Sequence, residues 1–261
     1  MYGTMTAPDN PLLVVENVGK RFSASFAIED VSFKLNRGET VAILGPSGSG
    51  KTTMLRCINF LTPYDSGTIR VGGRLVGYRE EGGRCLREKE ANIADIRKRI
   101  GFVFQRFNLF PHRTVIQNLT EGPVYVLGLS VDAAIERARR ALDLVGLRYK
   151  ENEWPDQLSG GQQQRVGIAR ALCMEPDMIL FDEATSSLDP ELVGEVLAVI
   201  RDLALSGMTM LLVTHEIAFA REVADRILFM ENGRLLADQP AEVFFAAPPS
   251  ARIAQFLARS M

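Results

Sequence analysis

A glycine-rich stretch, GPSGSGKT at positions 45–52, constrains the fold of this chain more than any other part of its sequence. It fits the pattern G-x-x-x-x-G-K-[ST], which holds phosphate when it follows a buried strand and opens a helix. The nearly all-apolar segment Glu39–Leu44 precedes it and the helical segment Thr52–Phe60 follows, which predicts a strand-loop-helix unit of an α/β fold. The glycines let backbone N–H groups converge on phosphate oxygens, and the helix N-terminus adds partial positive charge. We therefore expect ATP or GTP binding, with Lys51 bridging the β- and γ-phosphates and Thr52 ligating Mg²⁺.

The size and composition of the chain limit its class. With 261 residues, 46% of them apolar and 24% charged, it can form one large domain or two small ones without disulfides or metals. A net charge of -2 argues against a broad nucleic-acid-binding surface. Three widely spaced cysteines fit a reducing compartment. The N-terminus lacks a signal-peptide pattern and no apolar run is long enough to span a bilayer, so we expect a cytosolic protein that could still dock onto a membrane partner.

Hydrophobic patterning predicts two kinds of sheet. Segments 12–18 and 26–35 are typical of strands, and the second alternates apolar and polar residues as in a half-exposed antiparallel sheet. Other short apolar runs alternate with helical segments, which indicates a mostly parallel sheet. These runs cover residues 39–44, 100–104, 178–181, 208–213 and 226–230.

Helical patterns replace strand patterns between Gln105 and Gln157. Within this segment, residues 131–145 carry an apolar stripe at helical spacing. We therefore expect a helical subdomain inserted in the sheet. The charged, glycine-containing run 79–99 is interpreted as a surface excursion to which no chemistry can be assigned.

Polar residues stand where several predicted strands end. Asp182 and Glu183 follow one apolar strand, His215 follows another, and Gln105 a third. Parallel strands deliver their carboxyl ends to the ligand side of a sheet, so Asp182 can hold Mg²⁺ through water and Glu183 can polarise the attacking water. There His215 could hydrogen-bond the γ-phosphate and Gln105 could reach Mg²⁺ or the water. Each of these residues alone would be unremarkable on a surface, and the phosphate loop upstream favours the functional interpretation.

A second anion-binding candidate is the stretch LSGGQQQR at positions 158–165. A helix starting near Gln162, with Ser159 and the N–H groups of Gly160 and Gly161 ahead of it, forms an anion site of the helix-terminus kind. One chain therefore carries two phosphate-binding devices.

Taken in order, the phosphate loop, Gln105, LSGGQQQR, the segment ILFDE at 179–183 and His215 resemble the nucleotide-binding subunit of ABC transporters. The resemblance covers nearly the whole chain and implies a P-loop NTPase (RecA-like) core with an antiparallel β subdomain and an inserted α-helical subdomain. It implies a single ABC ATPase domain over residues 12–257, with the core and β subdomain at 12–104 and 166–247, the helical subdomain carrying the signature motif at 105–165, and a short C-terminal tail at 248–261.

The same resemblance implies the roles of individual residues. Phe22 matches the aromatic residue that stacks on adenine, although the family more often has tyrosine there and Phe22 could equally be a core residue. Gln105 matches the glutamine that contacts Mg²⁺ and senses the membrane subunit, and residues 187–189 match the loop that crosses the dimer interface. The catalytic residues are Glu183, His215 and Gln105. The Mg²⁺ ligands are Thr52, Gln105 and Asp182. The nucleotide-binding residues are Phe22, Gly45, Pro46, Ser47, Gly48, Ser49, Gly50, Lys51, Thr52, Thr53, Ser159, Gly160, Gly161, Gln162 and Asp189.

Three stretches narrow the subtype, because residues 104–112, 189–197 and 213–221 look like those of importers for polar amino acids of the histidine, glutamine and arginine type. This implies an ATPase that couples hydrolysis to solute uptake through a membrane permease. The partner of the chain would be a second copy of itself, so that residues 159–162 meet the γ-phosphate held by the other copy. Permease subunits would dock near residues 105–111, a solute-binding protein would act indirectly, and no nucleic acid is expected. The protein would be cytoplasmic and peripherally bound to the inner face of the cell membrane.

Two departures from the family pattern bear on the cargo. Ala184 stands where importers usually have proline, and the segment LLADQ at 235–239 replaces a more usual Glu-rich strand end. Neither touches a catalytic group. Two alternatives stay open: an ABC ATPase for an osmolyte, a metal or a lipid-related cargo, and a non-transport ABC protein acting on nucleic acid. The second alternative generally carries two cassettes, a long coiled-coil insertion or a zinc module, none of which is apparent in this sequence.

Overall fold

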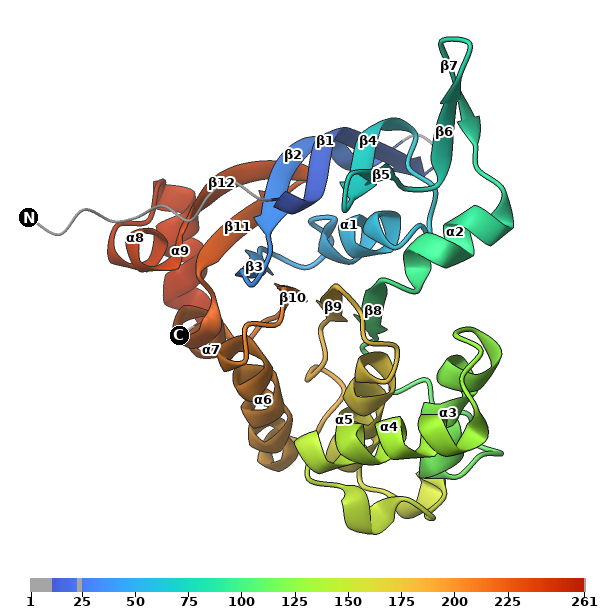
Figure 1. Cartoon of the computed structure of the whole chain (residues 1–261). Coiled ribbons are helices and arrows are strands. Elements are labelled where there is room, and N and C mark those ends of the chain that lie inside the picture. The colour runs from blue at the N-terminus through green and yellow to red at the C-terminus, as the bar shows by residue number, and fades with distance from the viewer. Residues whose placement is uncertain (1–10, 23–24, 261) are drawn as a thin grey trace, which may run out of the picture.

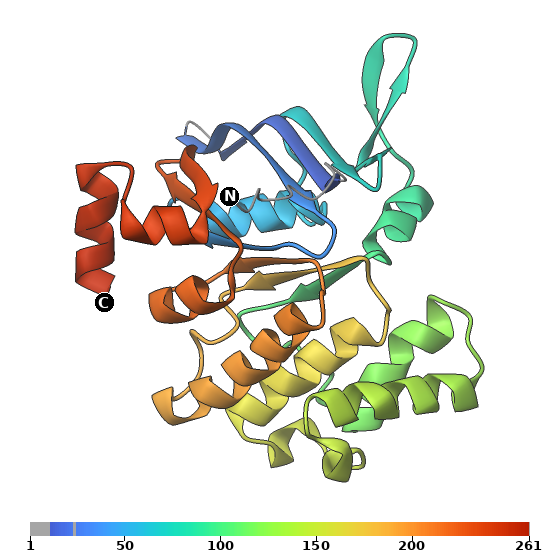
Figure 2. The same cartoon turned by 60° about the vertical axis from the view of Figure 1, so that its left-hand side comes forward.

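The computed structural model describes residues 11–22 and 25–260, and it places two sheets one above the other with a group of helices to one side (Figure 1). Helices α5 and α6 cover one face of the six-stranded central sheet, whereas α1 and a four-stranded antiparallel sheet cover the other (Figure 2). This α/β arrangement is the one that the sequence predicts.

The central sheet has the strand order β12-β11-β3-β10-β9-β8. Within this sheet, all neighbouring pairs from β11 to β8 are parallel. Of its described strands, only the edge strand β12 runs antiparallel to its neighbour. The strands are β3 (Thr40–Leu44), β8 (Ile100–Val103), β9 (Met178–Asp182), β10 (Met210–Val213), β11 (Arg226–Glu231) and β12 (Arg234–Pro240). The prediction of a mostly parallel sheet is confirmed. Hydrophobic patterning did not predict β12, and only the family resemblance placed a strand end at residues 235–239.

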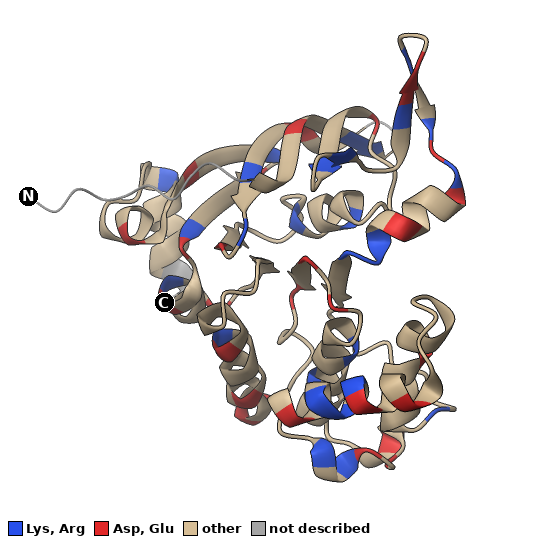
Figure 3. Ribbon diagram, viewed as in Figure 1, with Lys and Arg blue, Asp and Glu red and all other residues tan. Residues whose placement is uncertain are grey.

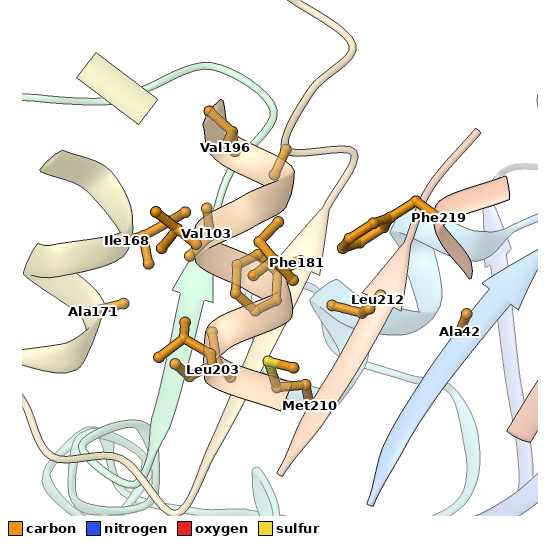
Figure 4. Close-up of a cluster of buried hydrophobic side chains, with 14 of the residues drawn as sticks. Ala42, Val103, Ile168, Ala171, Phe181, Val196, Leu203, Met210, Leu212 and Phe219 are labelled. Carbon is orange, nitrogen blue, oxygen red and sulfur yellow. The ribbon is translucent and has the colours of Figure 1, made fainter. Parts of the chain in front are cut away.

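Each central strand faces two separate cores because successive side chains point to opposite faces of a sheet. In β3, Val41 and Ile43 belong to the core shared with α1 and the antiparallel sheet. Ala42 and Leu44 belong to the core shared with α5 and α6. Figure 4 shows this second core, in which Phe181 of β9 lies among side chains from the helices. Burial on both faces explains why the strand sequences are almost entirely apolar.

The antiparallel sheet has the order β2-β1-β4-β5. Its strands are β1 (Pro11–Phe22), β2 (Ser25–Asn36), β4 (Ser66–Val71) and β5 (Arg74–Leu75). The first two strands are longer than the sequence predicts, because register shifts let the pairing continue past interruptions of the alternating pattern. The short strands β4 and β5 were not predicted.

The charged run 79–99 forms three elements: a projecting hairpin of β6 (Tyr78–Glu81) and β7 (Arg84–Arg87), and helix α2 (Glu90–Arg97) (Figure 1). The hairpin is largely exposed, as a surface excursion should be. Helix α2 corrects that interpretation, because it buries Ile93 and Ile96 in the core beneath the antiparallel sheet.

The remaining elements are helical. They are α1 (Lys51–Ile58), α3 (Val115–Tyr125), α4 (Val131–Leu144), η1 (Arg148–Lys150), η2 (Pro155–Gln157), α5 (Gly160–Leu172), α6 (Pro190–Leu205), α7 (Ile217–Val223), α8 (Ala241–Ala246) and α9 (Ala251–Ser260). The predicted apolar stripe of α4 is buried at Ala134, Ala138 and Leu142. Helix α5 begins at Gly160 rather than near Gln162, and it runs without a break through residue 165, where the sequence places a subdomain boundary.

The surface mixes charges of both signs. Acidic and basic residues occur together on α4 and on the β6–β7 hairpin (Figure 3), and Arg139 of α4 pairs with Glu136 and Glu151. Among residues 11–22 and 25–260, no helix has both the length and the apolar character needed to cross a membrane.

Candidate nucleotide site

The phosphate-binding loop, residues 45–52, connects β3 to α1. Gly45 and Gly50 have φ angles of 146° and 100°, which favour glycine. A Cβ atom at Gly45 would lie under 3.0 Å from the carbonyl oxygen of Met230, and one at Gly50 would meet the carbonyl oxygen of Ala27 equally closely. Strands β11 and β2 therefore hold the loop from two sides, and a larger residue at either glycine would displace it.

Lys51 is buried inside this loop. Its Nζ donates hydrogen bonds to the carbonyl oxygens of Gly45 (2.8 Å) and Pro46 (2.9 Å). Burial lowers the pKa of the lysine, while the carboxylates of Glu183 and Asp182 act in the opposite direction. The ammonium group is thus held at the centre of the loop, next to two acids.

Asp182 ends β9 and is buried beside the start of α1. The hydroxyl of Thr52 donates a 2.6 Å hydrogen bond to its Oδ1. Burial raises the pKa of Asp182, and the hydrogen bond from Thr52 partly offsets that rise. Two residues that lie 130 positions apart in sequence thus form one oxygen pair, as predicted for a magnesium site.

Glu183 has a φ angle of 50°, a left-handed conformation that is uncommon outside glycine and asparagine. Its N–H donates to the carbonyl oxygen of Val213 at 2.9 Å, which ties the residue to the end of β10. Its Oε1 lies 2.9 Å from Nε2 of His215. That hydrogen bond holds the pKa of Glu183 below its usual value, against the opposing effect of burial. A strained backbone supported by neighbouring strands is typical of functional sites, where it aims a side chain.

A pocket of about 350 Å³ lies between the phosphate loop and Glu183. It is lined by residues 47–53 of the loop and helix, by Ala27 and by Glu183. The phosphate loop with its Lys51 and the strand-end acid Glu183 therefore line one cavity, as the sequence predicts. Ala27 was not predicted, because an alanine within a strand gives no sequence signal.

The donors present fit a divalent cation that is shared with a nucleotide. Magnesium is usually held by one or two carboxylates together with phosphate oxygens and water, and Thr52 and Asp182 supply a hydroxyl and a carboxylate side by side. Within the described parts of the chain, no group of three or more His, Cys, Asp or Glu could hold a metal ion by itself. A cation held by Thr52 and Asp182 would take its further ligands from phosphate oxygens and water.

Several predicted site residues do not line this pocket, and three of them, Phe22, Gln105 and Asp189, are exposed. Phe22 is 50% exposed at the end of β1, so the alternative that it is a core residue is wrong. Gln105 is exposed just beyond β8, and Asp189 is exposed ahead of α6. None of the three lines the pocket.

The second anion-binding candidate also lies outside the pocket. Ser159 precedes α5, and its Oγ accepts a 3.2 Å hydrogen bond from the N–H of Gln162. The side chain of Gln162 accepts in return from the N–H of Ser159, which completes a capping box. Ser159 is exposed, while Gly161 is packed against Leu192 of α6. The first turn of the helix is therefore bonded internally, and it does not line the pocket of its own chain's phosphate loop.

The turn between β11 and β12 supports the loop in a way that the sequence did not reveal. The N–H of Gly233 donates a 3.1 Å hydrogen bond to the carbonyl oxygen of Ser49. Gly233 and Ser49 lie 184 residues apart in the sequence. The pairing of β11 with β3 brings them together, and no local pattern predicts this contact.

Comparison with known proteins agrees with this geometry. The pattern of the family described as "ABC transporter" matches residues 28–186. The chain is 52% identical to the L-cystine transport system ATP-binding protein TcyN of Escherichia coli (strain K12), over 93% of this chain and 96% of that protein. It is 45% identical to the glutamine transport ATP-binding protein GlnQ of Bacillus subtilis (strain 168), over 95% and 98%. Among solved structures it resembles the dimeric ATP-binding cassette MJ0796 bound to ADP and Pi, with a TM-score of 0.75 and 33% identity over 88% of this chain and 98% of that one.

The fold and the site define an ATP-binding P-loop hydrolase, with the phosphate loop and the strand-end acid Glu183 in one cavity. The chain belongs to the ABC transporter family, and it is an ATPase of that family.

Proposed function

We propose that this chain is the ATP-hydrolysing subunit of an importer for polar amino acids. Its relatives TcyN and GlnQ are named for the transport of cystine and glutamine. Both cargoes are zwitterions with polar side chains, and high identity over nearly the full length of both proteins supports the same class of cargo here.

The hydrolytic role rests on one observation, the pairing of Glu183 with His215 at the mouth of the phosphate pocket. Glu183 is ionised at neutral pH, since its pKa lies below the already acidic value of an ordinary glutamate, and the carboxylate can accept a proton from an attacking water. His215 holds the carboxylate in position and would contact the γ-phosphate. Lys51 exchanges its contacts with the loop carbonyls for contacts with phosphate oxygens. Thr52 and Asp182 would hold a magnesium ion, which would supply charge neutralisation at the phosphates.

The two exposed residues beside the pocket complete the nucleotide site in this proposal. The ring of Phe22 is accessible at the end of β1 and would stack on adenine. Gln105, beyond the end of β8, would contact the cation and report on the membrane subunit.

A second copy of the chain would close the site. Ser159 is exposed and bonded to Gln162 in a capping box, yet neither residue lines the pocket of its own chain. A two-fold dimer would place this helix terminus on the γ-phosphate of the partner, with Asp189 near the interface. MJ0796 has been solved as a dimer, which supports this arrangement.

The membrane subunits would bind beside residues 105–111. An apolar groove of about 420 Å³ lies next to this stretch and includes Phe104, Phe110 and Leu119. A short cytoplasmic helix of the permease would fill it, which would hold the ATPase on the inner face of the membrane. A solute-binding protein would act through the permease.

The variant Glu183→Gln tests the hydrolytic mechanism. The amide keeps the size of the side chain but cannot act as a base, so ATP turnover should fall by about 10²–10⁴. Size-exclusion chromatography with ATP and Mg²⁺ should show a stable dimer. Glu242→Gln on the exposed face of α8 is the matched control and should behave as the wild type. A Glu183→Gln chain that stays monomeric with ATP would contradict the composite site.

Uptake by the assembled transporter in proteoliposomes tests the cargo. Radiolabelled cystine, glutamine and glutamate should enter in an ATP-dependent manner that Glu183→Gln abolishes. Preference for an osmolyte, a metal or a lipid-related solute would replace the amino-acid assignment and leave the ATPase mechanism intact. ATPase stimulation by nucleic acid instead of by the membrane subunits would overturn the transport role.

A further inference from the structure

The apolar groove between α3 and α5 contains a cation with no acidic partner. For the argument, the groove is defined by Phe104, Phe110, Leu119, Val126 and Met174 together with Arg170. Two charged residues line it, Arg170 of α5 and Glu121 of α3.

The two charges differ in their surroundings. Glu121 already has a cation nearby, because its Oε1 lies 3.7 Å from Nη2 of Arg113. Arg170 donates from Nη1 to the carbonyl oxygen of Asn108 at 2.7 Å, and its guanidinium lies 5.8 Å from the centre of the Phe110 ring. In the part of the chain that the structure describes, no carboxylate forms an ion pair with Arg170.

Burial lowers the pKa of Arg170, and no neighbouring acid offsets it. A guanidinium carries its N–H donors in a fixed planar fork that matches a carboxylate, and here one nitrogen is engaged by a neutral carbonyl. A partly desolvated charge without a counter-charge does not help the isolated subunit fold. The remaining donors lie at the groove, where an incoming segment could reach them.

We propose that the segment of the membrane subunit that fills this groove presents an aspartate or glutamate to Arg170. The inference rests on the proposed docking of the permease and adds the chemistry of the contact. Apolar side chains of the segment bury against Phe104, Leu119 and Met174, and its carboxylate pairs with the guanidinium. The charge pair fixes the register of the segment, because an apolar groove alone would accept a helix shifted by one turn.

The test compares two substitutions in the full-length chain with its membrane subunits purified in detergent. Arg170→Met keeps the length and apolar stem of the side chain but removes the charge, whereas Arg170→Lys keeps the charge. Arg170→Met should weaken binding to the membrane subunits by about 30-fold, the lower range for losing one partner of a buried charge pair. Arg170→Lys should retain most of the affinity, since it can still pair with a carboxylate.

Thermal unfolding of the isolated subunit separates recognition from a structural role. Arg170→Met should shift the melting temperature by no more than about 2–4 °C, because it replaces an unpaired charge by an apolar group of similar size. Arg140→Met, at an exposed arginine of α4 outside the groove, is the matched control for loss of charge. It should change neither binding nor stability.

Two further variants decide the outcome. Arg170→Glu should abolish binding, and an Asp→Arg or Glu→Arg change in the membrane segment should restore it. Val126→Glu introduces a charge into the groove at a residue that is 46% exposed, and it should block docking whatever the chemistry of the segment. If Val126→Glu blocks binding while Arg170→Met and Arg170→Glu bind as the wild type does, the acidic contact is wrong and the docking stands. If Val126→Glu also binds normally, the docking itself is wrong.

Discussion

A pair of glycines in the phosphate loop offers a sharp test of how β2 supports the site. Gly48 and Gly50 have positive φ angles of 78° and 100°. Alanine at either position takes a left-handed conformation, which costs about 1–2 kcal/mol. At Gly48 the added Cβ meets nothing within 4 Å, whereas at Gly50 it comes under 3.0 Å from the carbonyl oxygen of Ala27. Relieving that overlap adds about 1–3 kcal/mol. Gly48→Ala should therefore lose about 1–2 kcal/mol of unfolding free energy, and Gly50→Ala about 2–5 kcal/mol.

Urea unfolding without nucleotide, followed by far-UV circular dichroism, measures this difference directly. Nucleotide is omitted because both glycines lie in the phosphate-binding loop, so altered binding would add to the difference in stability. If Gly50→Ala is no less stable than Gly48→Ala, β2 does not lie against the loop as described.

Three further results are expected. Thr52→Val removes the hydrogen bond to Asp182, which raises the pKa of that carboxyl further. The Mg²⁺ concentration for half-maximal ATPase activity should therefore increase about tenfold or more. Unchanged Mg²⁺ dependence would contradict the shared site. His215→Ala should raise the pKa of Glu183, measured by NMR titration of its labelled carboxylate. The stabilisation that this bond provides is present above the ordinary glutamate pKa and is lost as the pH falls through the lowered one, so the variant should lose stability at neutral pH and match the wild type in strong acid. Asn118→Leu removes the buried hydrogen bonds to Phe110, Arg113 and Thr114 and should cost about 1–3 kcal/mol in thermal unfolding; a neutral effect would show that water replaces the amide.

Local patterns in the sequence predicted most of the central sheet. The run at 178–181 identified β9 because a strand buried on both faces is continuously apolar, and the same reasoning identified β3 and β10. The predictions failed where the pattern is short or mixed. Strand β5 has only two residues. Helix α2 lies in a highly charged run, and its buried residues are the single pair Ile93 and Ile96, three positions apart. Neither carries enough periodic signal to stand out from a loop.

The sequence by itself determined the phosphate loop and the set of acids, because glycines, lysine and strand-end carboxylates stand in fixed order next to recognisable strands. Parallel strands bring their ends to one edge, so the proximity of Asp182 and Thr52 followed from the pattern.

The tertiary structure alone decided which of these groups touch. It paired Glu183 with His215, placed Ala27 on the loop and left the Ser159 helix terminus outside the pocket of its own chain. It also left Arg170 in an apolar groove without an ion-pair partner among the described residues, because Glu121 of the same groove pairs with Arg113. Burial and pairing depend on residues that are distant in sequence, and hydrophobic periodicity reports only which face of an element is covered. For that reason the chemistry of the site could be predicted from the sequence, and its partners could be inferred only from the fold.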